Sequence, residues 1–330
     1  MSPLRAAMPR RFLAALVLAL ATSTTPGHAQ APPYLTEWGT RGNGNGQFWQ
    51  PMGVAVGFDG RVYVTDCVNC RVQVFTSAGT YLAQWGTFGS GPGQLYWPAG
   101  LAVSADGRVY VADYENHRVQ VFTGDGTYVG QWGSKGSGNG QFHWPWGVAL
   151  DGEGNVYVAD WWNGRVQKFT AEGTYLTQWG TLGGGLYQIA PHGIAVSADG
   201  RVYVADNGYH RVKVFTTDGA YLFEWGPLDA DGGEWDAYGL ALDGSGNVYV
   251  TELWNDHRVR VFTHEGAYRA QWGCLGIGAG QFDMPSGVAV GGNGTIYVAD
   301  TYNDRIQVFG AMVTPATSVT WGRIKTLYRD

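Results

Sequence analysis

The chain has 330 residues, of which 52 are Gly and 15 are Trp, whereas only 15% are charged. Its apolar and aromatic content excludes a disordered chain, and the lack of a Gly-X-Y period excludes collagen. A formal net charge of −6 provides no electrostatic footprint for nucleic acid. The abundance of Gly, Trp and Tyr instead favours short strands joined by tight turns.

The first 29 residues have the features of a signal peptide. Three Arg near the start precede the apolar run Phe12–Ala21, and Ala29 offers a small residue for cleavage, with Ala31 as second choice. The run is shorter than the roughly 20 residues that span a membrane, and no later segment is apolar enough. We therefore expect residues 1–29 to be removed. The mature chain, with a net charge of −9, is expected to be bacterial and exported to the periplasm or the extracellular space.

A repeat of 46 or 47 residues fills the rest of the chain, as the spacing of its Trp-Gly pairs shows. The segment YLAQWG at Tyr81–Gly86 returns in each unit. So do segments like PMGVAV at Pro51–Val56, GRVYVTD at Gly60–Asp66 and RVQVFT at Arg71–Thr76. Each is a short apolar run bounded by turn residues, which predicts four strands per unit, sandwiched between neighbouring units. Six such units predict an all-β fold, a six-bladed β-propeller at residues 34–310.

Both ends of the chain offer a strand that would close the ring. Tyr34–Gly39 (YLTEWG) matches the fourth strand of the repeat and keeps its spacing to the next segment. The distance from Arg305 to Trp321 is longer than in the repeats, and Pro315 interrupts it. We therefore predict that Tyr34–Gly39 closes the ring and removes its free edge. Residues 311–330 are then a C-terminal tail that docks on the ring or serves as an export or anchoring signal.

The repeated units resemble NHL repeats, most recognisably in the segments DYENHRVQVF and DTYNDRIQVF. The resemblance covers nearly the whole mature chain and implies a six-bladed propeller. It implies no single activity, because such folds serve as binding modules and as enzymes. The zinc fingers and RING modules that accompany NHL propellers in animal ubiquitin ligases need more Cys and His than this chain contains.

Residues that recur in every unit are expected to be structural. An acid that ends the second strand recurs with an Arg that begins the third, as in Asp66 and Arg71, and we expect a forked ion pair at the hairpin turn. His117, His210 and His257 directly precede this Arg and are interpreted as repeat residues. The Trp of each Trp-Gly pair is expected to pack between blades with its indole N–H hydrogen-bonded. The other acid–Arg pairs are Asp113/Arg118, Asp160/Arg165, Asp206/Arg211, Glu252/Arg258 and Asp300/Arg305.

Residues that depart from the repeat are the candidates for a site. In a propeller, the loops between the second and third strands open on the same face as the loops between blades, and many aromatic residues occupy these positions. They indicate a surface that binds a protein, peptide or glycan, or alternatively half-buried covers for wide loops. These candidates are Trp49, Trp97, Trp144, Trp146, Trp161, Trp162, Tyr209, Trp235, Tyr238, Trp254 and Tyr302.

His192 is a further candidate on this face, in the entry turn APHG near the expected central channel. The peptidylglycine amidating lyase, which this chain resembles in fold, holds its zinc through His in such Pro-His turns, and a catalytic zinc needs three ligands. The equivalent positions here are Met52, Ala99, Trp146, His192, Tyr238 and Ser286. With one His among six positions, that chemistry is not expected, and His192 is interpreted as a hydrogen-bonded channel residue.

An acidic loop provides a candidate metal site. Asp229, Asp231, Glu234 and Asp236 concentrate oxygen ligands of the kind that Ca²⁺ takes, although their spacing is not that of an EF-hand. Backbone carbonyls would have to complete the coordination shell. The alternative is a solvated acidic loop, and no cofactor is otherwise expected.

Two of the three cysteines share one turn. Cys67 and Cys70 lie in the segment DCVNCR, where an oxidising compartment permits a small disulfide. A redox motif is not favoured, because no helix N-terminus is expected there to lower the pKa of a thiol. Cys274 is then left without a partner.

No nucleophile elbow or phosphate-binding loop occurs in a suitable context. The sequence therefore predicts a monomeric, non-catalytic binding or scaffold propeller for a protein, peptide or glycan. One alternative is a metal-dependent lyase or lactonase-like hydrolase with Zn or Ca in the channel, for which His192, Tyr238 and the acidic loop must converge. Another is a passive envelope or matrix component directed by the C-terminal tail.

Overall fold

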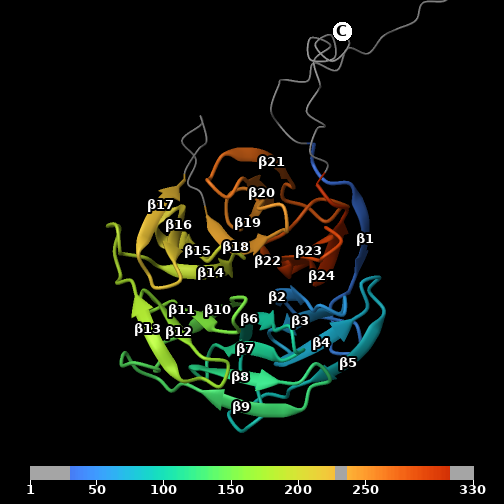
Figure 1. The fold of residues 1–330 in the computed structure, drawn as a ribbon. Coiled ribbons are helices and arrows are strands. Elements are labelled where there is room, and N and C mark those ends of the chain that lie inside the picture. The colour runs from blue at the N-terminus through green and yellow to red at the C-terminus, as the bar shows by residue number, and fades with distance from the viewer. Residues whose placement is uncertain (1–29, 227–235, 313–330) are drawn as a thin grey trace, which may run out of the picture.

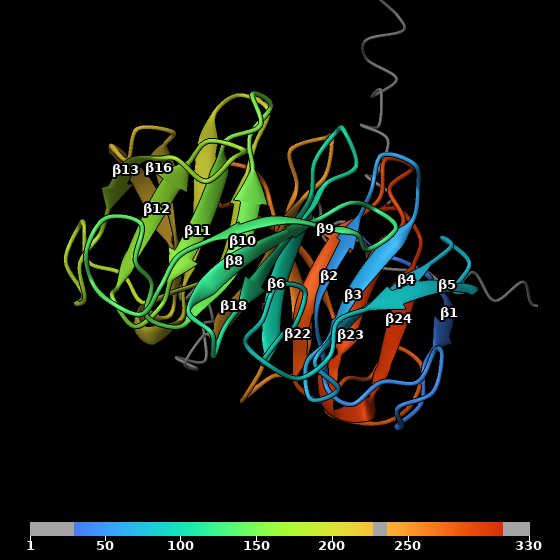
Figure 2. The ribbon, with the colours of Figure 1, turned by 90° about the horizontal axis from the view of Figure 1, so that it is seen from below.

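A computed structural model describes residues 30–226 and 236–312. These residues form 24 β-strands in six antiparallel sheets of four strands each. The sheets are arranged around a central axis, and each is twisted, as seen along that axis in Figure 1 and from the side in Figure 2. The prediction of an all-β, six-bladed β-propeller is confirmed.

The blades are numbered in chain order. Blade 1 consists of β2 to β5, each following blade takes the next four strands, and blade 6 consists of β22 to β24 with β1. Two short 3-10 helices, η1 (Asn207–Tyr209) and η2 (Thr301–Asn303), occupy hairpin turns, and no helix of the described residues is long and apolar enough to cross a membrane. The strands are β1 (Tyr34–Trp38), β2 (Pro51–Val56), β3 (Val62–Asp66), β4 (Arg71–Phe75), β5 (Tyr81–Trp85), β6 (Pro98–Val103), β7 (Val109–Asp113), β8 (Arg118–Phe122), β9 (Tyr128–Trp132), β10 (Pro145–Leu150), β11 (Val156–Asp160), β12 (Arg165–Phe169), β13 (Tyr175–Trp179), β14 (Pro191–Val196), β15 (Arg201–Asp206), β16 (Arg211–Thr216), β17 (Tyr221–Trp225), β18 (Ala237–Leu242), β19 (Val248–Glu252), β20 (Arg258–Phe262), β21 (Tyr268–Trp272), β22 (Pro285–Val290), β23 (Ile296–Asp300) and β24 (Arg305–Phe309).

The N-terminal strand closes the ring, as predicted. β1 pairs antiparallel with β24, so blade 6 has the strand order β22-β23-β24-β1. Trp38 faces Ile306 across this pair, which is the register that Trp85 and Val72 have in blade 1. The Gly310 N–H also donates to the Pro33 carbonyl at 2.8 Å. The fold therefore joins its first and last strands non-covalently.

The core lies between the blades. The second and third strands of blade 1, β3 and β4, are buried at every position, because each blade packs between two others. The innermost strand β2 is only partly buried, and the outer strand β5 alternates between half-buried and exposed residues. The expectation of apolar strands sandwiched on both faces therefore holds fully only for the second and third strands. One core cluster combines Val64 and Phe75 of blade 1 with Tyr297 and Ile306 of blade 6. Burial between blades therefore stabilises the ring as a whole.

The Trp of each Trp-Gly pair packs against the next blade. A Cβ added at Gly79 would lie 2.6 Å from the Trp38 ring, so this position accepts only Gly beneath the indole. The Trp38 ring also contacts Tyr297 edge-on, with centroids 5.9 Å apart. The expectation of a hydrogen bond from each indole N–H is wrong for the described residues, because these six groups are buried and have no hydrogen-bond partner within residues 30–226 and 236–312. They belong to Trp38, Trp85, Trp132, Trp179, Trp225 and Trp272.

The repeated acid–Arg pairs form as predicted, but not as forked pairs. In blade 2, Arg118 Nε donates to Asp113 Oδ2 at 2.7 Å, and both side chains are buried. The two terminal nitrogens of Arg118 donate to the carbonyls of Ser90, Gly91 and Gln94 in the loop that enters the blade. In blades 1 to 4 and 6, the Arg therefore ties the hairpin turn to the loop between blades as well as joining two strands.

The innermost strands approach one another closely through glycine. One Gly of each inner strand faces the backbone carbonyl of the next blade, where an added Cβ would lie under 3.0 Å from the oxygen. The contact repeats around the whole ring, so no blade tolerates a side chain at this position. The six positions are Gly53, Gly100, Gly147, Gly193, Gly239 and Gly287.

Candidate functional site

The hairpin turn between the second and third strands is tied to the loop that enters the same blade. In blade 3, the Asp160 carboxylate accepts the His143 N–H at 2.8 Å and the Asn163 side-chain amide at 2.9 Å. The Trp162 N–H donates to the His143 carbonyl at 3.2 Å. The carboxylate that ends the second strand therefore brings the loop of Trp144 next to the turn of Trp162.

Two of the candidate Trp residues have a left-handed backbone, which bulky residues rarely adopt. The φ angle is 53° at Trp97 and 59° at Trp144, each directly before the Pro of an inner strand. The Trp144 N–H donates to His117 Nδ1 at 3.1 Å, and the Met284 N–H donates to His257 Nδ1 at 3.0 Å. His117 and His257 thus join neighbouring blades, which is the structural role that their place in the repeat indicated.

Aromatic rings from four neighbouring blades form a continuous set on this face. The Tyr114 ring stacks on Trp144 with centroids 5.8 Å apart and contacts Trp146 edge-on at 5.1 Å. Trp146 lies 5.4 Å from Tyr238, and His192 lies 4.8 Å from the same Tyr238 ring. These separations are those of favourable ring contacts. We call this set the aromatic cluster, and its members are Tyr114, Trp144, Trp146, Trp161, Trp162, His192 and Tyr238.

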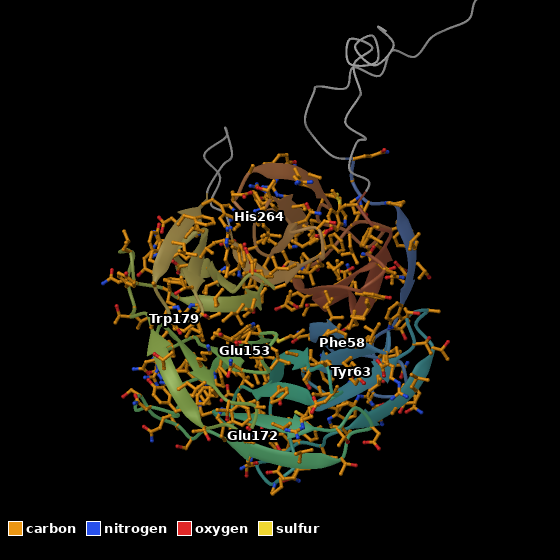
Figure 3. All side chains as sticks on the ribbon, in the orientation of Figure 1. Phe58, Tyr63, Glu153, Glu172, Trp179 and His264 are labelled. Carbon is orange, nitrogen blue, oxygen red and sulfur yellow. The ribbon has the colours of Figure 1, made fainter. Side chains whose placement is uncertain are left out.

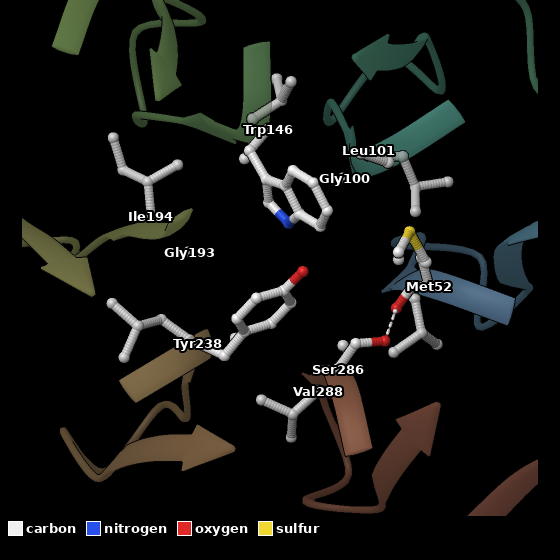
Figure 4. Close-up of a pocket in the computed structure, with 17 residues that line it drawn as sticks. Met52, Gly100, Leu101, Trp146, Gly193, Ile194, Tyr238, Ser286 and Val288 are labelled. Atoms are coloured by element: carbon white, nitrogen blue, oxygen red, sulfur yellow. Dashed lines mark hydrogen bonds between the residues drawn. The ribbon is translucent and has the colours of Figure 1, made fainter. Parts of the chain in front are cut away.

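The aromatic cluster reaches the central channel of the ring. Figure 4 shows the side chains of Trp146 and Tyr238 projecting into it, with the indole nitrogen and the phenol oxygen turned toward its middle. The cavity has a volume of about 70 Å³ and is otherwise lined by Gly and aliphatic residues together with Met52 and Ser286. Ser286 Oγ donates to the Met52 carbonyl at 3.1 Å. The Trp146 N–H and the Tyr238 O–H are therefore the polar groups that face the channel.

The aromatic cluster is almost uncharged. His192 is 7% exposed, and burial lowers its pKa to about 4, against an opposing effect of the Ala190 backbone. Burial raises the pKa of Tyr238 well above its usual value. Trp144 Nε1 donates a hydrogen bond to Glu115 Oε2 at 3.3 Å. Near neutral pH, the surface formed by these rings therefore presents apolar faces and neutral donors.

His192 packs among the rings of the aromatic cluster and interacts with the Ala190 backbone, but it is not among the residues that line the channel cavity. Its ring lies between Trp146, Trp161 and Tyr238, and its buried Nδ1 has no hydrogen-bond partner. The residues that line the channel include its neighbour Gly193 but not His192. The imidazole is held as part of the aromatic packing.

This burial predicts how stability depends on pH. The unfolded chain protonates His192 near pH 6.5, whereas the folded protein resists protonation until about pH 4. The unfolded state therefore binds more protons in this window, and stability falls as the pH falls from 6.5 to 4, by about 3 kcal/mol from this group. Urea unfolding of the wild type and His192→Gln at several pH values measures the effect. An equally steep loss in both proteins would contradict it.

The other aromatic candidates lie outside the aromatic cluster. The Arg41 guanidinium covers the Trp49 ring at 4.9 Å, and Arg211 covers Tyr209 at 5.5 Å. Trp49 and Tyr209 are therefore partly occupied by cation–π contacts within the chain. The remaining candidates are exposed and form no ring pair with the described residues: Trp97, Trp254 and Tyr302.

The candidate calcium site falls mostly outside the described residues, where Asp229, Asp231, Glu234 and Trp235 lie. Asp236 is described and is largely buried, and its Oδ1 is 3.5 Å from His210 Nδ1. Within residues 30–226 and 236–312, no group of three or more His, Cys, Asp or Glu is placed to hold a metal ion.

Cys67 and Cys70 are free thiols in the structure, so the proposed disulfide is not formed there. Cys70 has a left-handed backbone, with a φ angle of 54°. Cys70 Sγ lies 3.6 Å from the Val68 carbonyl, and the Trp97 backbone N–H is close enough to lower its pKa, although burial raises that pKa more strongly. The thiol thus takes the position that His117 and His257 have in other blades.

Sequence reasoning missed Tyr114 and His143. Tyr114 directly follows the strand-ending Asp113, just as Trp161 follows Asp160, so alignment of the repeats would have found it. The His143 ring lies 4.6 Å from the Trp144 ring, and no sequence signal marks that contact.

The strand order, the closed ring and the repeated acid–Arg hairpins define a six-bladed β-propeller built from one repeated unit. Five segments match the family model of the NHL repeat, at residues 48–75, 95–122, 142–169, 190–215 and 282–309. The chain is therefore an NHL-repeat β-propeller protein. The fifth blade lies outside these matches and departs most from the repeat, with Ala237 in place of the entry Pro, Glu252 in place of Asp, and one extra residue before Arg258.

Solved structures with the same fold have diverse functions. A Bacteroides thetaiotaomicron protein of unknown function has a TM-score of 0.66 and 20% identity over 85% of this chain and 76% of its own. A gluconolactonase from Xanthomonas campestris has a TM-score of 0.61 and 16% identity over 86% and 97% of the two chains. Virginiamycin B lyase from Staphylococcus aureus has a TM-score of 0.57 and 17% identity over 79% and 80%. At these identities the likeness concerns the fold. None of the curated proteins matches the chain in sequence.

Proposed function

We propose that this protein is an exported, non-catalytic binding propeller that holds a protein, peptide or glycan on the aromatic cluster. The observation that carries the proposal is the continuity of that cluster, in which rings from blades 2 to 5 contact one another from the loop face to the channel. Large aromatic side chains around a cavity with a few polar groups are typical of a binding site.

The distribution of the rings favours binding over a covering role. If wide loops needed aromatic covers, all six blades would carry them at equivalent positions. The position of Trp161 is occupied by Cys67 in blade 1 and by Thr301 in blade 6, and both of these are small and buried. Trp162 remains 51% exposed at the edge of the cluster, where it offers its ring to a ligand.

The chemistry of the surface favours an uncharged portion of the ligand. Burial lowers the pKa of His117 and His192, so both are neutral near pH 7. Stacking on Trp faces suits a sugar ring or an apolar or aromatic side chain. The inward Trp146 N–H and Tyr238 O–H suit a neutral hydrogen-bond acceptor, because a buried charge would find no partner among the channel-lining side chains.

Loss of two Trp residues tests this surface. A glycan array and an immobilised peptide library, probed with the intact protein, provide the ligands. We expect Trp161→Ala combined with Trp162→Ala to weaken binding at least about tenfold, because buried aromatic anchors dominate such interfaces. Trp254→Ala is the matched control, because Trp254 is 62% exposed and outside the aromatic cluster. Unchanged binding by the double variant, or equal loss in the control, would contradict the proposal.

The alternative proposal is a metal-dependent lyase or a lactonase-like hydrolase. It is supported by a lyase and a gluconolactonase among the solved structures of this fold and by the contact between His192 and Tyr238. It needs metal ligands beyond those two residues, and a catalytic zinc takes three. Metal analysis of the purified protein separates the two proposals, because stoichiometric zinc or calcium supports the enzyme.

A further inference from the structure

A groove opens on the face of the ring opposite the aromatic cluster, between blades 6 and 1. It has a volume of about 560 Å³. Its walls are the β2–β3 turn at residues 57–60, the β22–β23 turn at residues 291–293, and Ser77 with Tyr297. Tyr297 Oη donates to the Ser77 carbonyl at 3.3 Å, which closes the floor of the groove. We call this groove the open seam.

The open seam exists because small residues replace larger ones at its walls. The β2–β3 and β22–β23 turns begin with Gly57 and Gly291, where the other blades have Ser or Asp. In blade 3 that residue is Asp151, whose carboxylate accepts the Tyr157 hydroxyl at 2.9 Å. In blade 6 and blade 1, the corresponding side chains are missing, so the space between the turns stays open.

The same difference is seen in the side chains that cross from blade to blade. At the equivalent place between blades 2 and 3, Arg108 and Glu172 form an ion pair at 3.8 Å that joins the two blades. The corresponding residues at the open seam are Thr295 and Ala78, which are short and uncharged. The open seam therefore lacks the Ser or Asp side chain of the other turns and the ion pair found between blades 2 and 3.

Phe58 stands beside this space. Its side chain is 83% exposed at the tip of the β2–β3 turn, and Figure 3 shows it on blade 1 beside Tyr63. The equivalent residues of the other blades have little or no side chain, namely Ala105, Gly152, Ala198, Gly244 and Gly292. A single large apolar residue at a position that is otherwise Ala or Gly marks a contact specific to this seam.

The chain leaves the described structure near the β22–β23 turn, part of which lines the open seam. After β24, a Cβ added at Gly294 would lie 2.8 Å from Ala311 Cβ, so residue 311 rests on the β22–β23 turn. Met312 then packs against the core cluster between blades 5 and 6, and Val290, which lines the open seam, packs against the same cluster. The described chain therefore ends between blades 5 and 6, on blade 6, which also forms one wall of the open seam. An extended chain covers about 3.3 Å per residue, so the 18 residues that follow are long enough to reach the groove.

We propose that residues 313–330 dock into the open seam and contact Phe58. This segment contains Trp321, Ile324 and Leu327, which supply apolar groups for the groove. It also contains three basic residues and one acidic residue, which suits a chain of net negative charge. Asp59 on the rim of the groove already pairs with Arg61 at 3.3 Å, so the apolar groups are the main candidates for the contact. The docked segment provides the side chains that the walls of this seam lack.

Trypsin cleavage of the intact protein tests the docking. Cleavage after Arg323 and Lys325, followed by mass spectrometry, reports how often the segment is released. We expect Phe58→Ala to speed this cleavage about tenfold, because a buried Phe contact of ordinary strength shifts the docking equilibrium by about that factor. Phe88→Ala is the matched control, since Phe88 is 67% exposed in a loop outside the open seam, and it is expected to leave the rate unchanged.

A second measurement identifies the occupant. Amide hydrogen exchange at residues 57–60 and 291–294 is expected to be faster in a chain ending at Met312, which keeps all 24 strands, than in the full chain. Equal exchange in both chains, or no effect of Phe58→Ala on cleavage, would overturn the proposal. Protection that rises with protein concentration, together with a dimer in light scattering, would also overturn it, because a second copy would then fill the groove.

Discussion

Asp113→Ala is expected to lower the free energy of unfolding by about 4 kcal/mol, because it leaves a buried guanidinium without its counter-charge. In the wild type, Asp113 accepts hydrogen bonds from Arg118 Nε at 2.7 Å, from the Tyr96 N–H at 2.8 Å and from the Gln120 side-chain amide at 2.9 Å. The substitution removes the acceptor of all three donors. Urea denaturation followed by circular dichroism measures the loss.

The control for this variant lies in the same blade. Asp106 pairs with Arg108 at 3.1 Å, but both side chains are well exposed, and exposed pairs contribute little. We expect Asp106→Ala to change the free energy of unfolding by less than about 1 kcal/mol. Similar losses for the two variants would show that the buried pair does not hold the hairpin turn to the loop between blades.

Gly239→Ala is expected to destabilise the ring by about 3 kcal/mol, because the inner strands have no room for a side chain there. The added Cβ would overlap the Ser286 carbonyl oxygen of the next blade and lie 2.8 Å from Thr251 Oγ1. Backbone atoms on the neighbouring strand cannot move aside without opening the ring. The fall in melting temperature, measured by calorimetry, reports the cost.

Gly244→Ala is the matched control in the same blade. Its Cβ would meet no atom within 4 Å, so the variant is expected to keep the stability of the wild type. If Gly239→Ala were as stable as this control, the inner strands would tolerate greater separation than their contact with the next blade indicates.

The sequence was sufficient to predict the strands and the closing pair, because each is set by a local pattern that recurs. Pro51–Val56 is a strand with the predicted limits, and β1 pairs with β24 as the spacing of the Trp-Gly pairs required. The acid–Arg pairs were also predicted, since both partners flank the same turn.

Contacts between blades could not be predicted from local patterns. The indole of Trp38 lies over Gly79, more than forty residues away in sequence, and this packing leaves no partner for its N–H. The terminal nitrogens of Arg118 reach carbonyls in the loop before the blade, which a single hairpin does not reveal. The ring contacts of the aromatic cluster could not be predicted for the same reason, because these rings meet only when blades are placed side by side.

Ring closure through β1 and β24 has a consequence for the order in which the protein is built. The segment Tyr34–Trp38 is synthesised before the other strands of the ring, yet its pairing partner Arg305–Phe309 is synthesised after them. The β1–β24 pair cannot form until translation of the ring is complete, and closing so long a loop is slow. Until then, β1 has no pairing partner. Its free edge can pair with another chain, so a nascent chain has to be kept apart from its neighbours.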